Sequence, residues 1–172
     1  MVKKIYYGLA VYDKKEINAV INVLKDNSLS LIDGEKVKKL EKYVSKIFGK
    51  KYGLMVNSGS SANLLALSSF NFKKGSEIIT PSLTFSTTVA PIYQLGLVPH
   101  FIGVEENKFL ADVSQIKKCI NKKTVAIMIP NLLGNIAEWK KIHLIAKKYN
   151  LKVIEDSADT IGYKVNKKNL GK

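Results

Sequence analysis

The sequence predicts an α/β protein with a mostly parallel sheet and helices on both faces. From residue 50 onward, short apolar runs alternate with segments of helical periodicity, which is the pattern of βαβ units. One run, Val125-Ala126-Ile127-Met128-Ile129, is apolar without interruption, as expected of a parallel strand buried on both faces. Ligands of such sheets bind beyond the carboxyl ends of the strands, so the residues that follow each strand are the first candidates for a site.

Residues 1–50 are predicted to form a helical segment that precedes a sheet domain over residues 51–172. Asp13 and Glu16 have the spacing of a capping box, and the apolar residues that follow mark one helical face. A second amphipathic helix is expected from about Gly34 to a stop at Gly49. Its inward positions should be Val37, Leu40, Tyr43, Val44 and Ile47.

A short strand over residues 53–56 is expected to lead through a turn of small polar residues directly into a helix. The start of a helix offers unpaired N–H groups and partial positive charge, which suit a phosphate. Gly59 lets a ligand approach the backbone, and Ser60 and Ser61 add hydroxyl groups. The same local pattern also suits a plain N-cap, so this stretch leaves both interpretations open.

The later elements alternate regularly. The expected strands are residues 77–80, 97–104, 124–129 and 151–154, and the expected helices are residues 85–94, 112–120 and 137–150. A hairpin should begin at Tyr163, with residues 166–169 at its turn. Four polar or aromatic clusters follow the strands and could converge at one edge of the sheet: residues 57–60, 81–85, 130–131 and 155–156.

The composition limits the possible functions. The net charge is +14 and every basic residue is lysine, which admits a nucleic-acid-binding module. The lysines are spread along the whole chain and arginine is absent, so solvated helix faces explain them better. The chain has a lone Cys119, an N-terminus that lacks the apolar segment of a signal peptide, and no long apolar run, which predicts a cytoplasmic protein without a membrane span. His100 and His143 lack partner ligands in the sequence, so no metal site is expected, and Cys119 should be a buried thiol.

Four motifs, in this order and at these spacings, resemble the DegT/DnrJ/EryC1/StrS family of sugar aminotransferases. They are Asn57-Ser58-Gly59-Ser60-Ser61-Ala62, Thr80-Pro81-Ser82-Leu83-Thr84-Phe85-Ser86-Thr87-Thr88, Asn131-Leu132-Leu133-Gly134-Asn135 and Val153-Ile154-Glu155-Asp156-Ser157-Ala158-Asp159. The resemblance extends from Asp13 to the final hairpin. It implies an aspartate-aminotransferase-like large domain and a pyridoxal 5'-phosphate or pyridoxamine 5'-phosphate cofactor.

The resemblance also implies roles for individual residues. Gly59, Ser60 and Ser61 would hold the cofactor phosphate, and Phe85 would stack on the pyridine ring. Asp156 would pair with the pyridine nitrogen and keep it protonated, so that the ring can act as an electron sink. The alternative roles are a helix cap for the stretch of Gly59, Ser60 and Ser61, a core aromatic for Phe85 and a strand-end cap for Asp156.

Two further residues bear on the subtype. Asp159 falls at a cofactor-facing position where aminotransferases of the family commonly carry glutamine or histidine, and Asn131 falls where many relatives carry histidine. Together with residues 63–66 and 133–135, Asp159 looks more like the branch that dehydrates nucleotide-linked 4-keto-6-deoxyhexoses at carbon 3. The alternative is a sugar aminotransferase with a Schiff-base lysine and glutamate as amino donor.

The resemblance places the catalytic residue, lysine or histidine, beyond Lys172, and the small C-terminal domain is also absent from these 172 residues. The isolated chain is therefore expected to be inactive. The family's usual setting implies a homodimer when full length, a nucleotide-sugar substrate and a role in lipopolysaccharide or O-antigen synthesis. A non-enzymatic phosphate binder and a lysine-rich nucleic-acid module are the alternatives from other classes.

Overall fold

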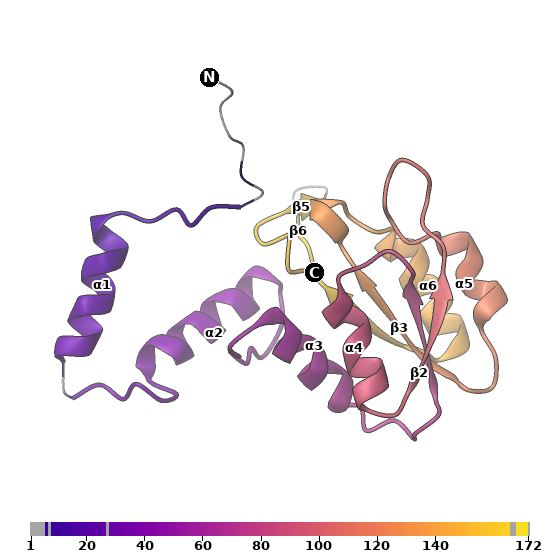
Figure 1. The fold of residues 1–172 in the computed structure, drawn as a ribbon, viewed down its shortest axis with the longest axis horizontal. Helices are drawn as coiled ribbons and strands as arrows, with labels where there is room; N and C mark the ends of the chain where they lie inside the picture. The colour runs from indigo at the N-terminus through magenta and orange to yellow at the C-terminus, as the bar shows by residue number, and fades with distance from the viewer. Residues whose placement is uncertain (1–5, 7, 27, 166–167, 172) are drawn as a thin grey trace.

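The computed structural model describes residues 6, 8–26, 28–165 and 168–171 (Figure 1). Its centre is a four-stranded parallel sheet in the order β2-β1-β3-β4. The strands are β1 (Glu77–Pro81), β2 (Val98–Ile102), β3 (Thr124–Pro130) and β4 (Lys152–Asp156). Along the middle of the sheet, Ile79 pairs with Ile127, which in turn pairs with Val153. The predicted parallel sheet is confirmed, with strand ends shifted by one or two residues.

Two layers of helices cover the two faces of this sheet. One face packs on α3 (Gly59–Ser68) and α4 (Ser86–Gln94), and the other packs on α5 (Val113–Cys119) and α6 (Trp139–Tyr149). The pleat of the strands separates the two cores, because successive side chains point to opposite faces. In β3, Ile127 and Ile129 belong to the α5–α6 core, whereas Met128 belongs to the α3–α4 core. The central strand is thus buried on both faces, as its apolar run predicts.

The order of the strands creates a switch point between β1 and β3. From β1 the chain crosses through α4 to β2 on one side, and from β3 it crosses through α6 to β4 on the other side. Crossovers of one hand that run in opposite directions place their helices on opposite faces. The loops that leave β1 and β3 therefore diverge and open a crevice at the carboxyl edge, which is where such sheets bind ligands.

The first two helices stand apart from the sheet (Figure 1). They are α1 (Lys14–Lys25) and α2 (Glu35–Ile47). The predicted capping box at the start of α1 is confirmed: Lys15 N–H donates to Asp13 Oδ1 at 2.6 Å, and Asp13 N–H donates to Glu16 Oε2 at 2.7 Å. No residue of α1 is buried, so its apolar face stays open in this chain.

Two expectations about this region are wrong. Residues 53–56 form no strand, because the Met55 N–H donates to Glu41 Oε1 at 2.7 Å instead of to a neighbouring strand. A Cβ on Gly53 would lie 2.6 Å from the Glu41 carbonyl oxygen, so this segment packs closely along α2. The apolar side of α2 is only partly inward, since Leu40 is 43% exposed and Tyr43 is 65% exposed.

The predicted hairpin near the end of the chain is confirmed. Strand β5 (Lys164–Val165) pairs with β6 (Lys168–Asn169) in antiparallel register, so the last two residues of the expected turn belong to a strand. Residues 166–167 lie outside the described part of the chain. The hairpin packs on the end of α2: Asn169 Nδ2 donates to the Ile47 carbonyl at 2.9 Å, and a Cβ on Gly171 would lie 3.1 Å from the Phe48 ring.

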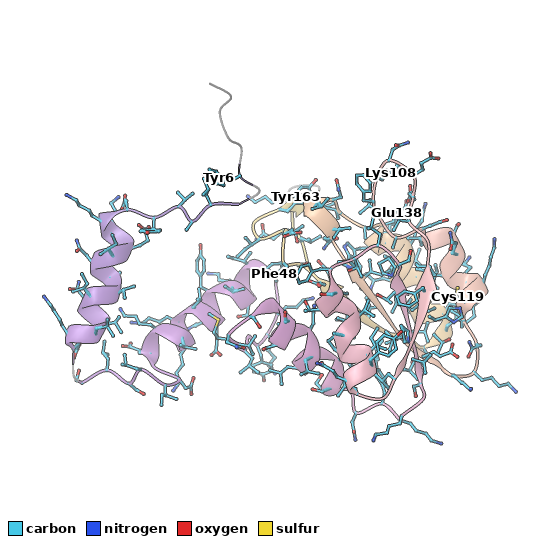
Figure 2. The ribbon with its side chains drawn as sticks, in the orientation of Figure 1. Tyr6, Phe48, Lys108, Cys119, Glu138 and Tyr163 are labelled. Carbon is cyan, nitrogen blue, oxygen red and sulfur yellow. The ribbon has the colours of Figure 1, made fainter. Side chains whose placement is uncertain are left out.

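Two smaller expectations concern Cys119 and membrane spans. Cys119 is half-buried at the end of α5, where it packs against the α5–α6 core, so it is less enclosed than predicted (Figure 2). None of the helices in the described part of the chain has the length and hydropathy that a membrane span requires.

Candidate functional site

A cavity of about 630 Å³ opens at the switch point of the sheet. Its walls come from the loops after β1 and β3, the carboxyl end of β4 and the first turn of α3. Six of the seven residues predicted for the site line this cavity: Gly59, Ser60, Phe85, Asn131, Asp156 and Asp159. Residues almost one hundred positions apart in the sequence are thus brought together by the parallel order of the strands.

The first turn of α3 forms one end of the cavity. Ser58 is the N-cap residue, and its Oγ accepts from the Ser61 N–H at 3.2 Å. The Ser61 hydroxyl donates to Asn57 Oδ1 at 2.7 Å, so Ser61 closes the cap and does not line the cavity. A Cβ on Gly59 would meet no protein atom within 4 Å. Packing within the chain therefore gives no reason for glycine at this position, whereas close approach of a ligand does.

Phe85 lies at the N-cap of α4 and lines the middle of the predicted site. Its side chain is 68% exposed, so it is not the core residue that the alternative interpretation required. An open aromatic ring at a cavity can cover the face of a flat ligand. The neighbouring Thr84 hydroxyl is buried without a hydrogen-bond partner among the described residues, and it too lines the cavity.

Asp156 ends β4, and its carboxylate lines the cavity. Asn63 Nδ2 donates to Asp156 Oδ2 at 2.9 Å, and Thr88 Oγ1 donates to the same oxygen at 3.0 Å. The Ala158 N–H donates to Oδ1 at 3.3 Å. No salt bridge in the described part of the chain involves Asp156. The carboxylate is therefore held in place by neutral hydrogen-bond donors and not by a positively charged side chain.

Asp159 also lines the cavity, and its side chain supports a turn. Its Oδ2 accepts from the Leu133 N–H at 3.1 Å. Leu133 has a φ of 56°, a left-handed conformation that costs a non-glycine residue about 1 kcal/mol or more. Asp159 thus stabilises the tight turn η1 (Leu132–Gly134), which forms one wall of the cavity.

Asn131 is brought to the cavity, but its side chain is engaged elsewhere. Its Nδ2 donates to Glu155 Oε1 at 3.0 Å and to Ser157 Oγ at 3.2 Å. Its Oδ1 accepts from the Ala137 N–H at 3.1 Å and from Trp139 Nε1 at 2.9 Å. Asn131 is 1% exposed, and these four bonds use its polar atoms fully. Its geometry is that of a residue that fixes the loop after β3, and direct cofactor contact by its amide stays a prediction.

Sequence reasoning missed Asn63 and Thr88 as site residues. Both are buried, at 8% and 0% exposed, and both lie in helices of the α3–α4 layer. The available signal was a polar residue at a buried helical position, since such groups need a partner. Only the packing of α3 and α4 over the end of β4 identifies Asp156 as that partner.

The electrostatics of the cavity contrast with those of the whole chain. The chain carries a net charge of +14, yet the charged residues that line the cavity are Asp156 and Asp159, with no lysine from the described residues among them. No group of three potential metal ligands is found in the described part of the chain. The cavity therefore offers a negative end at the strands and the positive end of a helix at Gly59.

Three known proteins are similar to this chain in sequence or in fold. The solved structure of E. coli GDP-4-keto-6-deoxy-D-mannose-3-dehydratase with bound hydrated PLP is 35% identical, with a TM-score of 0.85 over 93% of this chain and 42% of that chain. The structure of PseC, a Helicobacter pylori aminotransferase involved in the biosynthesis of pseudoaminic acid, is 28% identical, with a TM-score of 0.90 over 97% of this chain and 45% of that chain.

The third is the lipopolysaccharide biosynthesis protein RfbH of Salmonella typhimurium, which is 36% identical over 88% of this chain and 36% of its own length. The chain thus spans less than half the length of each of these three proteins. The family model for DegT/DnrJ/EryC1/StrS aminotransferases matches residues 11–172, which include every element of the sheet and its cavity. The chain belongs to the DegT/DnrJ/EryC1/StrS aminotransferase family.

Proposed function

We propose that the cavity binds pyridoxal phosphate or pyridoxamine phosphate. The observation that carries this proposal is the carboxylate of Asp156, which is ordered by two neutral donors and has no cationic partner in the described part of the chain. Such a group suits a ligand that brings its own positive charge, as a protonated pyridine ring does. A lysine paired with Asp156 would have competed with the protonated ring for the carboxylate.

The other walls of the cavity match the remaining parts of this cofactor. The N–H groups at the start of α3, with Gly59 and Ser60, suit the phosphate, and the exposed ring of Phe85 suits the face of the pyridine. The unpartnered Thr84 hydroxyl gives one more donor or acceptor at this wall. When bound, the cofactor supplies an electron sink for proton removal next to its amino group. Asp156 holds a proton at the ring nitrogen, and Phe85 excludes water from one face.

For the whole protein, we propose a reaction on a nucleotide-linked 4-keto-6-deoxyhexose, 3-dehydration in preference to amino transfer. The preference for 3-dehydration is supported by the E. coli relative named as a 3-dehydratase, together with the buried Asn63 and the carboxylate of Asp159. The alternative is a sugar aminotransferase, which the family description and the Helicobacter pylori relative support. The coding sequence beyond the codon for Lys172 decides between them: a lysine after the hairpin means an aminotransferase, and a histidine means a 3-dehydratase.

We further propose a cytoplasmic homodimer that acts in surface polysaccharide synthesis, with residues 51–172 as part of the cofactor-binding domain and residues 1–50 as a helical segment before it. The Salmonella typhimurium relative supports the biosynthetic setting. The open apolar face of α1, with Val20 at 60% and Leu24 at 62% exposure, supports an oligomer. Sedimentation of the full-length protein tests the dimer, which a monomeric mass would contradict.

The cofactor proposal is tested by calorimetric titration of the chain with pyridoxamine phosphate. This probe has no aldehyde, so it cannot form covalent adducts with the 28 lysines. We expect one site per chain, weaker binding of pyridoxamine without its phosphate, and competition by inorganic phosphate. Binding that is equally tight with and without the phosphate group would remove the proposed role of Gly59 and Ser60.

A further inference from the structure

The carboxylate of Asp156 is held asymmetrically by two side chains from different helices. Asn63 in α3 and Thr88 in α4 both donate to Oδ2, at 2.9 and 3.0 Å, whereas Oδ1 receives one backbone N–H at 3.3 Å. Asn63 Nδ2 also donates to the Thr87 carbonyl at 3.3 Å, which fixes the orientation of its amide. One oxygen of Asp156 is thus saturated by the protein, and the other keeps most of its capacity to accept.

We propose that Asn63 and Thr88 are positioning residues that dedicate Oδ1 of Asp156 to the ring nitrogen of the cofactor and keep that nitrogen protonated. This inference rests on the proposed cofactor site. Two donors on Oδ2, from two different helices, hold the carboxylate in one orientation and leave Oδ1 as the oxygen with free capacity to accept. A carboxylate oxygen fixed opposite the ring nitrogen stabilises a pyridinium and not a neutral pyridine.

Both side chains that donate to Asp156 are neutral. A lysine or histidine at either position would orient Asp156 equally well, but its charge would oppose the positive ring nitrogen. Asn63 and Thr88 give directional bonds without a net charge. Because both are almost fully enclosed, water cannot replace the bond that is lost when one of them is changed.

The experiment uses the 172-residue chain and pyridoxamine phosphate. The variants Asn63→Leu and Thr88→Val remove one donor each, and Thr88→Ser keeps the hydroxyl. Thr80→Val is the matched control, because Thr80 is fully buried and its hydroxyl has no partner among the described residues. Two quantities are measured for each protein: the Kd, and the pH at which the bound ring nitrogen loses its proton, followed by the nitrogen chemical shift of isotope-labelled cofactor.

We expect Asn63→Leu and Thr88→Val to weaken binding about tenfold each and to move the deprotonation of the ring nitrogen to lower pH. Thr88→Ser and Thr80→Val should match the wild type in both measurements. A fall in affinity with an unmoved titration of the ring nitrogen would overturn the inference, since a purely structural defect would act in that way. Absence of binding by the wild type would instead refute the proposed cofactor site itself.

A double-mutant cycle gives a second test, with the folded fraction of each variant checked by circular dichroism. If Asn63 acts through Asp156, then Asn63→Leu adds little to the loss already caused by Asp156→Ala. We expect the double variant to bind within about twofold of Asp156→Ala alone. Losses that multiply would show that Asn63 acts independently of Asp156, contrary to the proposal.

Discussion

Replacing Phe85 with alanine tests the cavity at a largely exposed aromatic residue of its lining. Phe85 is 68% exposed and makes no side-chain capping bond at the start of α4. Full burial of a phenylalanine side chain is worth about 1.5 to 3 kcal/mol, so the buried third contributes at most about 1 kcal/mol to stability. We therefore expect Phe85→Ala to fold normally, with a small decrease in melting temperature.

The exposed part of the ring is the surface that a stacked cofactor would cover. On the same scale it is worth about 1 to 2 kcal/mol of binding, which corresponds to an increase in Kd of about 5- to 30-fold. Calorimetric titration with pyridoxamine phosphate measures this change. Tyr93→Ala is the matched control, because Tyr93 is 62% exposed, belongs to the same helix and lies outside the cavity lining.

The outcome separates stacking from a general effect of removing an exposed aromatic ring. Tyr93→Ala should bind the cofactor with the wild-type Kd. If Phe85→Ala also binds with the wild-type Kd, the proposed stacking is refuted. A large loss of thermal stability in Phe85→Ala would show instead that the Phe85 ring contributes more to the stability of the fold than its exposed fraction suggests.

Two further predictions concern the sheet and its helices. Asp112 is the N-cap of α5, where hydrogen bonds from Ser114 lower the pKa of its carboxyl group. Asp112→Ala should lower the free energy of unfolding in urea by about 1 kcal/mol. An unchanged urea midpoint would contradict this prediction. Hydrogen bonds from Asn121 and then His100 lower the pKa of Glu77, so its stabilising contribution is present above the pKa of unfolded glutamate and is lost as pH falls through the native pKa. The stability of Glu77→Gln should therefore fall below that of the wild type near neutral pH and approach it in acid, and a gap that is constant with pH would contradict this.

Local chemistry predicted most of the fold. The capping box at Asp13 and Glu16 and the cap at Asp112 each depend on residues three positions apart or fewer, so they can be read directly from the sequence. The buried strand β3 is indicated in the sequence by an unbroken apolar run. The wrong strand over residues 53–56 has equally suitable residues, but a strand requires a partner, and that requirement is not local.

The site was predictable as far as strand ends and motifs could identify it. Asp156 ends β4 and Phe85 lies in the loop after β1, so their meeting in one cavity follows from a parallel sheet. Asn63 was not predictable as a partner of Asp156, because the two are separated by 93 positions and meet only through the packing of α3 on the sheet. The amide oxygen of Asn131 likewise accepts from Ala137, in the loop before α6, and from Trp139, the first residue of α6, and no pattern in the sequence indicates these partners.

The most direct test of the account is the affinity of Asp156→Ala for pyridoxamine phosphate, measured by calorimetry beside the wild type and Lys141→Ala. Lys141 lies on α6, outside the cavity, and pairs with Glu138. We predict that the wild type and Lys141→Ala bind alike, and that Asp156→Ala loses binding by tenfold or more, the order expected for an unmade hydrogen bond to a charged group. Wild-type affinity in Asp156→Ala would contradict the assignment of this cavity as the cofactor site.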